Sequence, residues 1–588
     1  MDPIKNEQLT AASGHGESCL AALYESAESI ALWVERRKYL ALIVGLIVYA
    51  CFTVPIAQRK LIWDDEFFTL YISGTASFSE IWKALLTGAD QHPPLFYFLT
   101  HTVFSVFGMS HLTLRLPAML GFWLMMLCLY MIVARHTSSI YGLTAMMFPL
   151  LTKVVYYATE ARGYGLVLGF GSLALLCWLC AADNYRRSFA LPGLWLSLML
   201  AVGSHYYAIL LLLPLGVGEL VRLLTTRRID WAMVAAFTGA GLPLALFHTA
   251  IRRAQTYSSH FWAQPSWMQP FAFFPDVFRP VVLPLLAALT ISFIVLQLRF
   301  PRRGQHSEQI RPVWQLHEIS ALMGFILLPF ICTLVAKLVT HAYHPRYVVS
   351  AFLSGIILIL AGFYQAYGGR RSAGLMLCLL VLCSLPYAWL KERDKVYGSI
   401  GNLRATAQFL EHHNPESWPI VVAEVTQFHR LSYYAPRKLA RQLIYAADPE
   451  KSVKYLRHNT IDRGLLDLRP WFPERIEEYR SVLWSYPRFF CYGYIGDWTW
   501  LTYALIDDQL ETKLIGRQQH DRLLIAVNNP RGAISTSESA PFHRNSIIET
   551  AFQRAERDWQ DNALTVCDQW TKDTNCGLLR SQQRGKFK

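Results

Sequence analysis

The chain has 588 residues, of which 53% are apolar and 16% charged, and its formal net charge is +13. Soluble domains carry about 25% charged residues, so this composition excludes an ordinary soluble protein. The acidic residues are unevenly spread, with 18 in residues 1–390 and 24 in the remaining 198. The basic residues stand mainly at the ends of apolar runs, where lipid head groups explain the positive charge better than a nucleic acid does. No nucleic-acid partner is predicted.

Apolar runs of about 20 residues, the length that crosses a bilayer as a helix, fill the first two-thirds of the chain. The first run, at residues 39–56, follows 38 mostly polar residues without a clear cleavage site, which indicates a retained signal anchor. The runs at 190–204 and 206–222 could be one kinked segment, broken at residues 203–205. In all, about eleven spans are predicted, near 39–56, 112–134, 139–156, 162–182, 190–204, 206–222, 231–250, 281–299, 318–338, 347–366 and 373–390.

Basic residues in the short loops indicate the orientation of these spans. If residues 1–38 are cytoplasmic, almost every basic doublet falls on the cytoplasmic side, as the positive-inside rule expects. The exception is Arg252-Arg253, directly after a span. An odd number of spans then places the chain from residue 391 onwards outside the cytoplasm. The short loops favour a bacterial inner membrane with this part in the periplasm, and an endoplasmic reticulum membrane is the alternative.

Four segments follow from this reading. We expect a cytoplasmic segment at 1–38, an all-α polytopic membrane domain at 39–390, a soluble extracytoplasmic α/β domain at 391–545 and a polar tail at 546–588. The α/β class is indicated by short apolar runs, such as residues 419–425 and 522–527, that alternate with polar helical stretches.

Three adjacent acids, Asp64, Asp65 and Glu66, stand just after the first span. Neighbouring carboxylates that lose hydration repel one another, so at least one of them binds a proton at higher pH than in water. Such a group suits a general base, and the cluster could instead hold a divalent cation. A solvated loop start is the plain alternative. The flanking Trp63 and Phe67 argue against it, because aromatic rings draw a segment toward the membrane interface.

Two further groups lie in outer loops. Glu160 and Arg162 stand at the outer end of two spans, where a buried charge is costly and hence a functional candidate, and an Arg fork matches a phosphate. The alternative is a local ion pair that closes the turn. His92 precedes Pro93-Pro94, which stiffen the loop and could hold the imidazole near a substrate, although this signal alone slightly favours a plain loop.

The outer ends of two other spans are also polar and aromatic. His205 and Tyr206 mark one helix turn, and Arg346 and Tyr347 enter a span close to the level of a lipid phosphate. Anchoring at the membrane interface is the alternative for both pairs.

These groups all fall on one face of the membrane. Channels and transporters place ionisable groups in mid-span, whereas here they collect at span mouths, which favours chemistry at the membrane surface. His341 and His344 are three residues apart, but a clear third ligand is missing and Pro345 breaks the helix, so no metal-ligand set is predicted.

The order of these motifs resembles the polytopic glycosyltransferases of the type-C fold, which use polyprenyl-phosphate-linked sugars. This group includes the protein O-mannosyltransferases and the lipid A aminoarabinose transferases. The resemblance covers about residues 39–370. It rests on Asp65-Glu66, His92-Pro93-Pro94-Leu95, Arg115-Leu116-Pro117, Glu160-Ala161-Arg162-Gly163-Tyr164, His205-Tyr206-Tyr207 and Arg346-Tyr347.

The resemblance implies an inverting transfer of a sugar from a polyprenyl-phosphate donor to an acceptor hydroxyl at the extracytoplasmic face. Asp65 would be the general base, with Asp64 or Glu66 in support, although the triplet leaves the choice between Asp64 and Asp65 open. Glu160 would assist in positioning or protonation. Cations would neutralise the lipid phosphate as the glycosidic bond breaks. The binding residues implied in this way are Arg162, Arg346, His92, His205, Tyr206 and Tyr347.

Some features stay open at this level. No cofactor is implied, and a divalent cation is an option because metal dependence varies across the type-C enzymes. The acceptor could be a glycan, a lipid or a protein. The alternative function is a transporter or flippase of lipid-linked saccharides, which would carry charges within its spans and have pseudo-symmetric halves. A third reading is a receptor or scaffold that the spans merely anchor.

Overall fold

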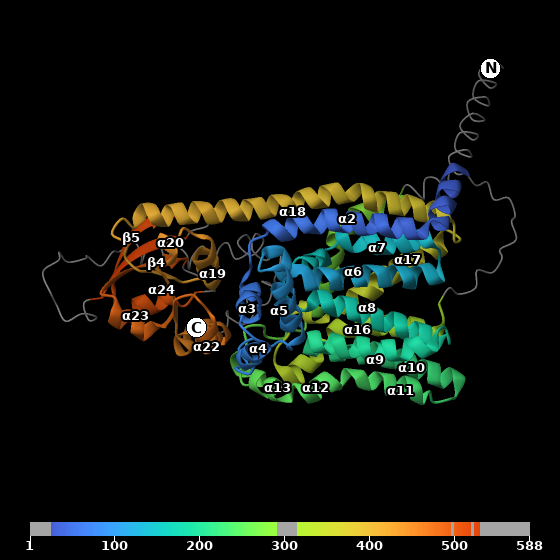
Figure 1. The fold of residues 1–588 in the computed structure, drawn as a ribbon, viewed down its shortest axis with the longest axis horizontal. Helices are drawn as coiled ribbons and strands as arrows, with labels where there is room; N and C mark the ends of the chain where they lie inside the picture. The colour runs from blue at the N-terminus through green and yellow to red at the C-terminus, as the bar shows by residue number, and fades with distance from the viewer. Residues whose placement is uncertain (1–24, 288, 291–313, 495–498, 519–521, 530–588) are drawn as a thin grey trace, which may run out of the picture.

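A computed structural model describes residues 25–287, 289–290, 314–494, 499–518 and 522–529 of the chain. It shows a bundle of long helices joined to a smaller α/β domain, with three short helices, α3, α4 and α5, between them (Figure 1). The predicted polar tail at 546–588 and the doublet Arg302-Arg303 lie outside the described residues.

The bundle is built from apolar helices that run roughly parallel to one another (Figure 1). Their bounds are α2 (Lys38–Arg59), α6 (His111–His136), α7 (Ser139–Met147), α8 (Tyr164–Ala182), α9 (Arg187–Ser204), α10 (Leu212–Thr226), α11 (Trp231–Phe237), α12 (Leu242–Leu246), α13 (His248–Gln255), α14 (Gln269–Phe278), α16 (Leu316–Val335), α17 (Phe352–Ala366) and α18 (Arg371–His413).

Eight of the described helices are long and apolar enough to cross a membrane, or nine if the bent pair Trp231–Leu246 and His248–Gln255 is one span. The predicted all-α polytopic architecture is confirmed, and the chain is an integral membrane protein. Three predicted runs do not appear as predicted among these eight. Residues 139–156 form the short α7 followed by 3-10 turns, α9 is not counted as a span although the run that follows it from Tyr206 is, and the run at 281–299 lies partly outside the described residues.

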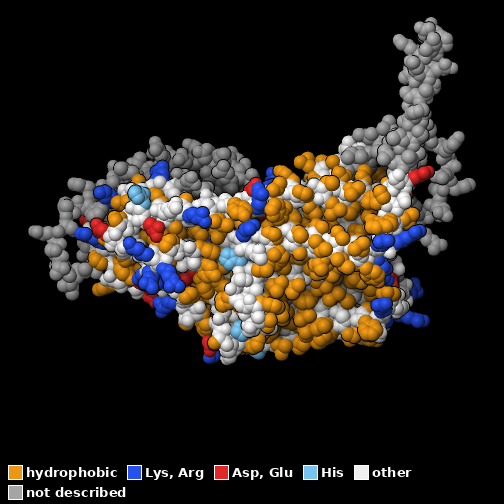
Figure 2. Space-filling view, turned by 45° about the horizontal axis from the view of Figure 1, so that its top comes forward, with side chains coloured by type: hydrophobic (Ala, Val, Ile, Leu, Met, Phe, Trp, Pro, Cys, Tyr) orange, Lys and Arg blue, Asp and Glu red, His pale blue; other side chains and the backbone are white. Residues whose placement is uncertain are grey.

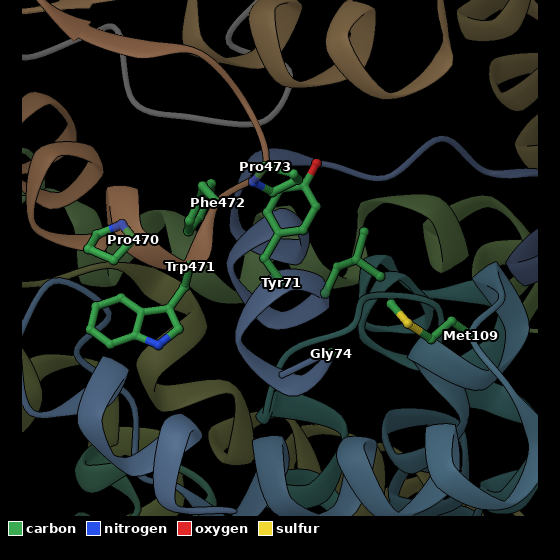
Figure 3. Close-up of a pocket in the computed structure, with 8 residues that line it drawn as sticks. Tyr71, Gly74, Met109, Pro470, Trp471, Phe472 and Pro473 are labelled. Carbon is green, nitrogen blue, oxygen red and sulfur yellow. The ribbon is translucent and has the colours of Figure 1, made fainter. Parts of the chain in front are cut away.

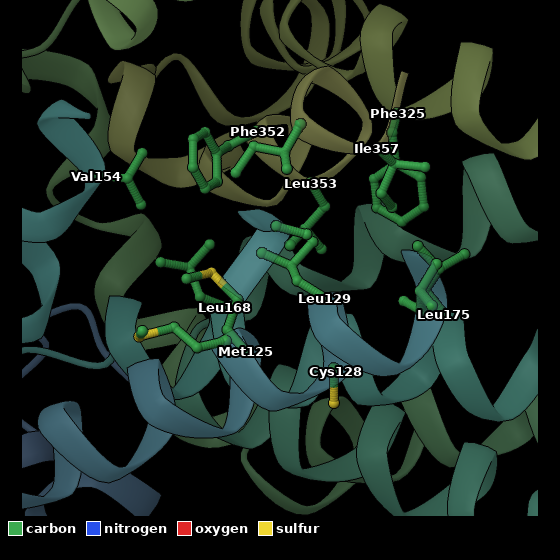
Figure 4. Close-up of a cluster of buried hydrophobic side chains, with 14 of the residues drawn as sticks. Met125, Cys128, Leu129, Val154, Leu168, Leu175, Phe325, Phe352, Leu353 and Ile357 are labelled. Atoms are coloured by element: carbon green, nitrogen blue, oxygen red, sulfur yellow. The ribbon is translucent and has the colours of Figure 1, made fainter. Parts of the chain in front are cut away.

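Side chains from α6, α8, α16 and α17 fill the core of the bundle (Figure 4). Helices α6 and α8 approach each other closely, because small residues let the two backbones meet. A Cβ atom on Gly165 would lie 2.4 Å from the carbonyl oxygen of Ala118. This contact brings the starts of the two helices together, and Arg115 and Arg162 are found there.

A broad belt of apolar side chains covers the bundle, and Lys and Arg side chains gather at its end away from the α/β domain (Figure 2). The belt fits a bilayer as its solvent. The basic end fits the head groups of one leaflet.

The segment between the first two predicted spans contains three helices, α3 (Asp64–Ser73), α4 (Phe78–Leu85) and α5 (Leu95–Phe107). The Ser77 side chain accepts a hydrogen bond from the backbone of Glu80 and so caps α4. The acidic triplet forms the first turn of α3, where the helix dipole favours negative charge.

Helix α18 connects the two parts of the molecule. It runs without interruption through 43 residues, from Arg371 to His413, so the expected domain boundary at residue 390 falls inside it. Its second half packs Leu403, Ala407 and Leu410 into the core of the α/β domain.

The α/β domain has a six-stranded sheet in the order β3-β2-β1-β4-β6-β5. Strands β1 to β4 are parallel, and β6 is antiparallel to both β4 and β5. Buried apolar clusters cover both faces of the sheet, which confirms the predicted α/β class. The bounds are β1 (Ile420–Val422), α19 (Val425–Tyr434), α20 (Arg437–Ala440), β2 (Leu443–Ala447), α21 (Pro449–Leu456), α22 (Thr460–Leu468), β3 (Ile476–Glu478), α23 (Tyr479–Ser485), β4 (Arg488–Gly493), α24 (Leu501–Asp507), β5 (Glu511–Arg517) and β6 (Leu523–Asn528).

Candidate active site

The candidate site lies where the first turn of α3 meets the bundle and the α/β domain. Glu66 closes this turn, because its Oε2 accepts a hydrogen bond from the backbone N–H of Trp63 at 3.0 Å. The turn therefore holds Asp64, Asp65 and Glu66 in a fixed arrangement, and each of the three carboxylates meets a different partner.

Glu66 faces the bundle and pairs with Arg115, and both side chains are fully buried. Its two oxygens accept from Nε and Nη2 of Arg115 at 2.8 and 2.7 Å, and Oε1 also accepts from the backbone of Ala161 at 2.7 Å. Burial alone would raise the pKa of Glu66, but the charge and hydrogen bonds of Arg115 lower it to about 2. The other donors of the guanidinium bind the backbone carbonyls of Ala57, Lys60 and Leu61.

Asp64 faces the α/β domain. Its Oδ2 accepts a hydrogen bond from Thr426 of α19 at 2.5 Å, while its Oδ1 is buried without a partner among the described residues. Burial raises the pKa of Asp64, and the charge of His429 opposes this rise.

Asp65 faces the space between these two. Its side chain is 26% exposed and forms an ion pair with Nη1 of Arg346 at 2.9 Å. Arg346 begins a short 3-10 helix, Pro345–Ala351, at the mouth of α17. Of the three carboxylates, Asp65 is therefore the one that combines exposure with a cation.

Arg162 is held by a buried network. Its two Nη atoms donate to the two oxygens of Asp90, each at 2.8 Å, and Nη1 also donates to the backbone carbonyl of Asp65 at 3.1 Å. Its Nη2 lies 2.7 Å from Nδ1 of His92, and the hydroxyl of Tyr97 donates to Asp90. The charge of Arg162 holds the pKa of Asp90 well below its usual range against the effect of burial. Burial and the same charge lower the pKa of His92.

Glu160 is only 1% exposed. Neither of its oxygens has a hydrogen-bond partner among the described residues. Burial raises the pKa of Glu160 to about 7, although Arg346 and Lys60 oppose the rise. Lys60 donates to the carbonyl of Thr159 at 3.1 Å, and burial lowers its pKa to about 8.

Aromatic rings surround Arg346. The guanidinium lies 5.5 Å from the ring of Tyr164 and 5.7 Å from that of Trp262, which are cation–π distances. Tyr347 stacks on Tyr207 at 4.8 Å and also contacts His205. These aromatic rings can pack against the face of a sugar, and the guanidinium of Arg346 can bind a phosphate beside it.

The structure brings most of the predicted residues to one place. The three acids, Glu160, Arg162, Arg346, His92, His205 and Tyr347 all take part in the contacts described above. Tyr206 does not share the ring contacts of its neighbour Tyr207, and its hydroxyl has no hydrogen-bond partner among the described residues. The roles of all these residues stay predictions.

Sequence reasoning missed several members of the site. Asp90 stands two residues before His92, and a carboxylate so close to the stiff proline pair was a usable signal. Lys60 directly follows the first span, and it is also close in sequence to the acids. Trp262 and Thr426 carried no local signal, because only folding brings them to the site.

The α/β domain reaches the site through α19. Arg430 donates to the carbonyl of Ile62 at 3.1 Å, and the hydroxyl of Tyr434 accepts from the backbone of Ile62 at 3.0 Å. Beside this contact, a groove of about 340 Å³ opens between Tyr71 of α3, Met109 and residues 470–473 (Figure 3). The groove is lined mainly by aromatic and aliphatic side chains.

Comparison with known proteins agrees with this geometry. Residues 91–251 match the model of the dolichyl-phosphate-mannose-protein mannosyltransferase family. The crystal structure of ArnT from Cupriavidus metallidurans in the apo state matches with a TM-score of 0.50 and 13% identity, over 85% of this chain and 98% of that one. The chain is a glycosyltransferase with the type-C fold. The enzyme class predicted from the motifs is thus confirmed.

The structure of ArnT from the same organism bound to undecaprenyl phosphate matches with a TM-score of 0.49 and 14% identity, over 85% of this chain and 99% of that one. No curated protein matches the chain. The family match contains the motifs around His92, Arg115, Glu160, Arg162 and His205, which are the residues that the geometry groups on the bundle side of the site.

Proposed function

We propose that this glycosyltransferase moves a sugar from a polyprenyl-phosphate donor to an acceptor hydroxyl, with Asp65 as the general base. The observation that carries the proposal is the ion pair between the partly exposed Asp65 and Arg346. One group can take the acceptor proton, and the other can stabilise the phosphate that leaves.

The surroundings of the acids favour Asp65 over its neighbours. Glu66 has its oxygens occupied by Arg115 and two backbone groups, so it fits a positioning role. Asp64 is hydrogen-bonded to the α/β domain. Among the described side chains, Asp65 pairs with Arg346 alone, and a donor phosphate would compete for that partner and leave the carboxylate free to accept a proton.

The proposed reaction is a direct displacement. The acceptor oxygen attacks the anomeric carbon as its proton passes to Asp65, and the bond from that carbon to the phosphate oxygen breaks. The bonding pair leaves with the lipid phosphate, whose added charge Arg346 stabilises. A single displacement of this kind inverts the anomeric carbon. Arg162 contributes mainly by holding the Asp90 and His92 loop, because both of its Nη atoms are already bound.

We also propose that the site faces the periplasm of a bacterial inner membrane. The candidate site and the α/β domain lie at one end of the bundle, and Lys and Arg side chains gather at the other. The positive-inside rule assigns the basic end to the cytoplasm. The expected segments follow this assignment, with 1–38 cytoplasmic, 39–390 in the membrane and 391–545 outside.

A transfer assay tests the proposal. Membranes that contain the protein are given polyprenyl-phosphate sugars with radiolabelled mannose or aminoarabinose, and label is followed into membrane lipid, glycan and protein. Asp65→Asn should abolish transfer at unchanged protein level, because it removes the base and keeps the shape. Asp394→Asn, on an exposed part of α18, is the matched control and should keep full transfer. Full transfer by Asp65→Asn would show that the base is assigned wrongly.

A further inference from the structure

A second group of ionisable side chains lies at the opposite end of the bundle. Asp183 follows the last residue of α8, and His317 and Glu318 stand in the first turn of α16. One potential ligand atom from each of the three residues lies within 4.8 Å of the others. Helix α6 separates this end from the candidate active site, and its 26 residues span roughly 38 Å at about 1.5 Å per residue.

Two of these three residues carry a buried polar atom that no described residue hydrogen-bonds. Glu318 is 1% exposed, and its Oε2 accepts a hydrogen bond from the backbone of Gln315 at 2.7 Å, but its Oε1 has no hydrogen-bond partner among the described residues. His317 is 7% exposed, and within the same part of the chain its Nε2 has none either. Buried polar atoms without a partner are rare because each costs about 1–3 kcal/mol, so two that converge on one place call for a ligand.

The charges around the group agree with a cation. Asp183 is paired on its outer side with Arg135, which offsets one negative charge, whereas no described ion pair to a Lys or Arg neutralises Glu318. His136 of α6 supplies a further imidazole, since its Nε2 lies 3.5 Å from Oε1 of Glu318. The ring of His136 is held by stacking on Trp314 at 3.8 Å.

We propose that Asp183, His317 and Glu318 bind a divalent transition-metal ion of the zinc class, with His136 as the fourth ligand. The donor set decides the class of metal: imidazole with carboxylates suits Zn²⁺, whereas Mg²⁺ and Ca²⁺ prefer oxygen alone. Zinc bonds of about 2.0–2.2 Å put neighbouring ligand atoms roughly 3.4 Å apart, so small side-chain rotations close the site. The ion would join the ends of α6, α8 and α16 and is separate from the proposed transfer reaction.

The test uses the full chain in detergent, purified through a tag without histidine and stripped with a chelator. We expect it to bind about one equivalent of Zn²⁺ with sub-micromolar affinity, since pre-arranged sites of this kind bind far more tightly than single surface groups. Co²⁺ in its place should give the visible absorption of a tetrahedral site. His317→Gln and Glu318→Gln should each weaken binding at least about tenfold. The exposed His412→Gln is the matched control and should bind as the wild type does.

Several outcomes would overturn the proposal. Binding weaker than micromolar in the wild type would do so, as would equal affinity in Glu318→Gln. The Glu318→Gln variant keeps the carbonyl oxygen that caps Gln315, and the elution profile of each variant reports whether it is folded. Zinc bound at the acidic triplet instead would be lost in Asp64→Asn and kept in His317→Gln, which is the reverse of the expected pattern.

Discussion

The pairing of Glu66 with Arg115 makes a prediction about what Glu66 does. In Glu66→Gln, one oxygen becomes an amide donor. Both oxygens accept from a guanidinium N–H and a backbone N–H, so either orientation of the amide sets donor against donor. The charge of Arg115 also loses its counter-ion in a fully buried place. Breaking a buried pair in this way costs about 3–5 kcal/mol.

This loss is large for a folded protein, because total stability is about 5–15 kcal/mol. For a chain of this size we expect the midpoint of thermal unfolding to fall by roughly 2–4 °C. Glu80→Gln is the control, since Glu80 is an acid on the neighbouring α4 with a 38% exposed side chain, and its midpoint should hardly move. The assay is thermal unfolding in detergent alongside the transfer rate of the protein that remains folded.

The two measurements separate a positioning role from a reacting one. If Glu66 only positions α3, Glu66→Gln lowers the unfolding midpoint. A variant with the wild-type midpoint and no transfer would refute this reasoning and make Glu66 a reacting group. Arg115→Lys should be intermediate, because it keeps the charge and has fewer donors than the five hydrogen bonds require.

Three further predictions concern the same region. Asp90→Asn should lower the unfolding midpoint and the transfer rate together, because it costs Arg162 its buried counter-ion, worth about 3 kcal/mol; an unchanged midpoint would contradict this. Gly165→Leu should cost about 1–3 kcal/mol and lower the yield of folded protein, because α6 leaves no room for a Cβ atom, whereas Gly216→Leu faces open space and should be neutral. Burial raises the pKa of Glu160 from 4.5 to about 7, so the folded state binds the extra proton and stability falls as pH rises between these values. The unfolding midpoint of Glu160→Gln should lack this part of the pH dependence, and equal slopes for the two proteins would exclude it.

The sequence predicts the site well where the signal is local. Glu160 and Arg162 stand at the end of one span, and Arg346 stands at the start of another. Charged residues cost free energy at these positions, so the sequence alone marks them as functional candidates. Orientation of the spans then places them on one face. Because these residues and Asp65 are predicted on the same face of the membrane, the sequence predicts that they lie near one another, even without knowledge of the helix order.

What the sequence could not predict depends on contacts between distant segments. The hydroxyl of Thr426 meets Asp64 across 362 positions, and no local pattern marks it. Hydropathy likewise reads residues 139–156 as one span, because it does not register the change from α-helix to 3-10 turns after Met147. The group of Asp183, His317 and Glu318 likewise has no local pattern, since it forms only where the end of α8 meets the start of α16.

The acidic triplet shows why three carboxylates in a row need not be redundant. Successive residues of an α-helix point about 100° apart, so one turn of α3 directs Asp64, Asp65 and Glu66 to three different parts of the molecule. Glu66 binds α6 of the bundle, Asp64 binds α19 of the α/β domain, and Asp65 meets Arg346 between them. The contacts of Asp64 and Glu66 fix the rotation of α3 about its axis. That rotation determines the direction in which the Asp65 side chain points. Any movement of the α/β domain that drew α19 away from Asp64 would therefore turn Asp65 away from Arg346, which links the state of that domain to the chemistry of the site.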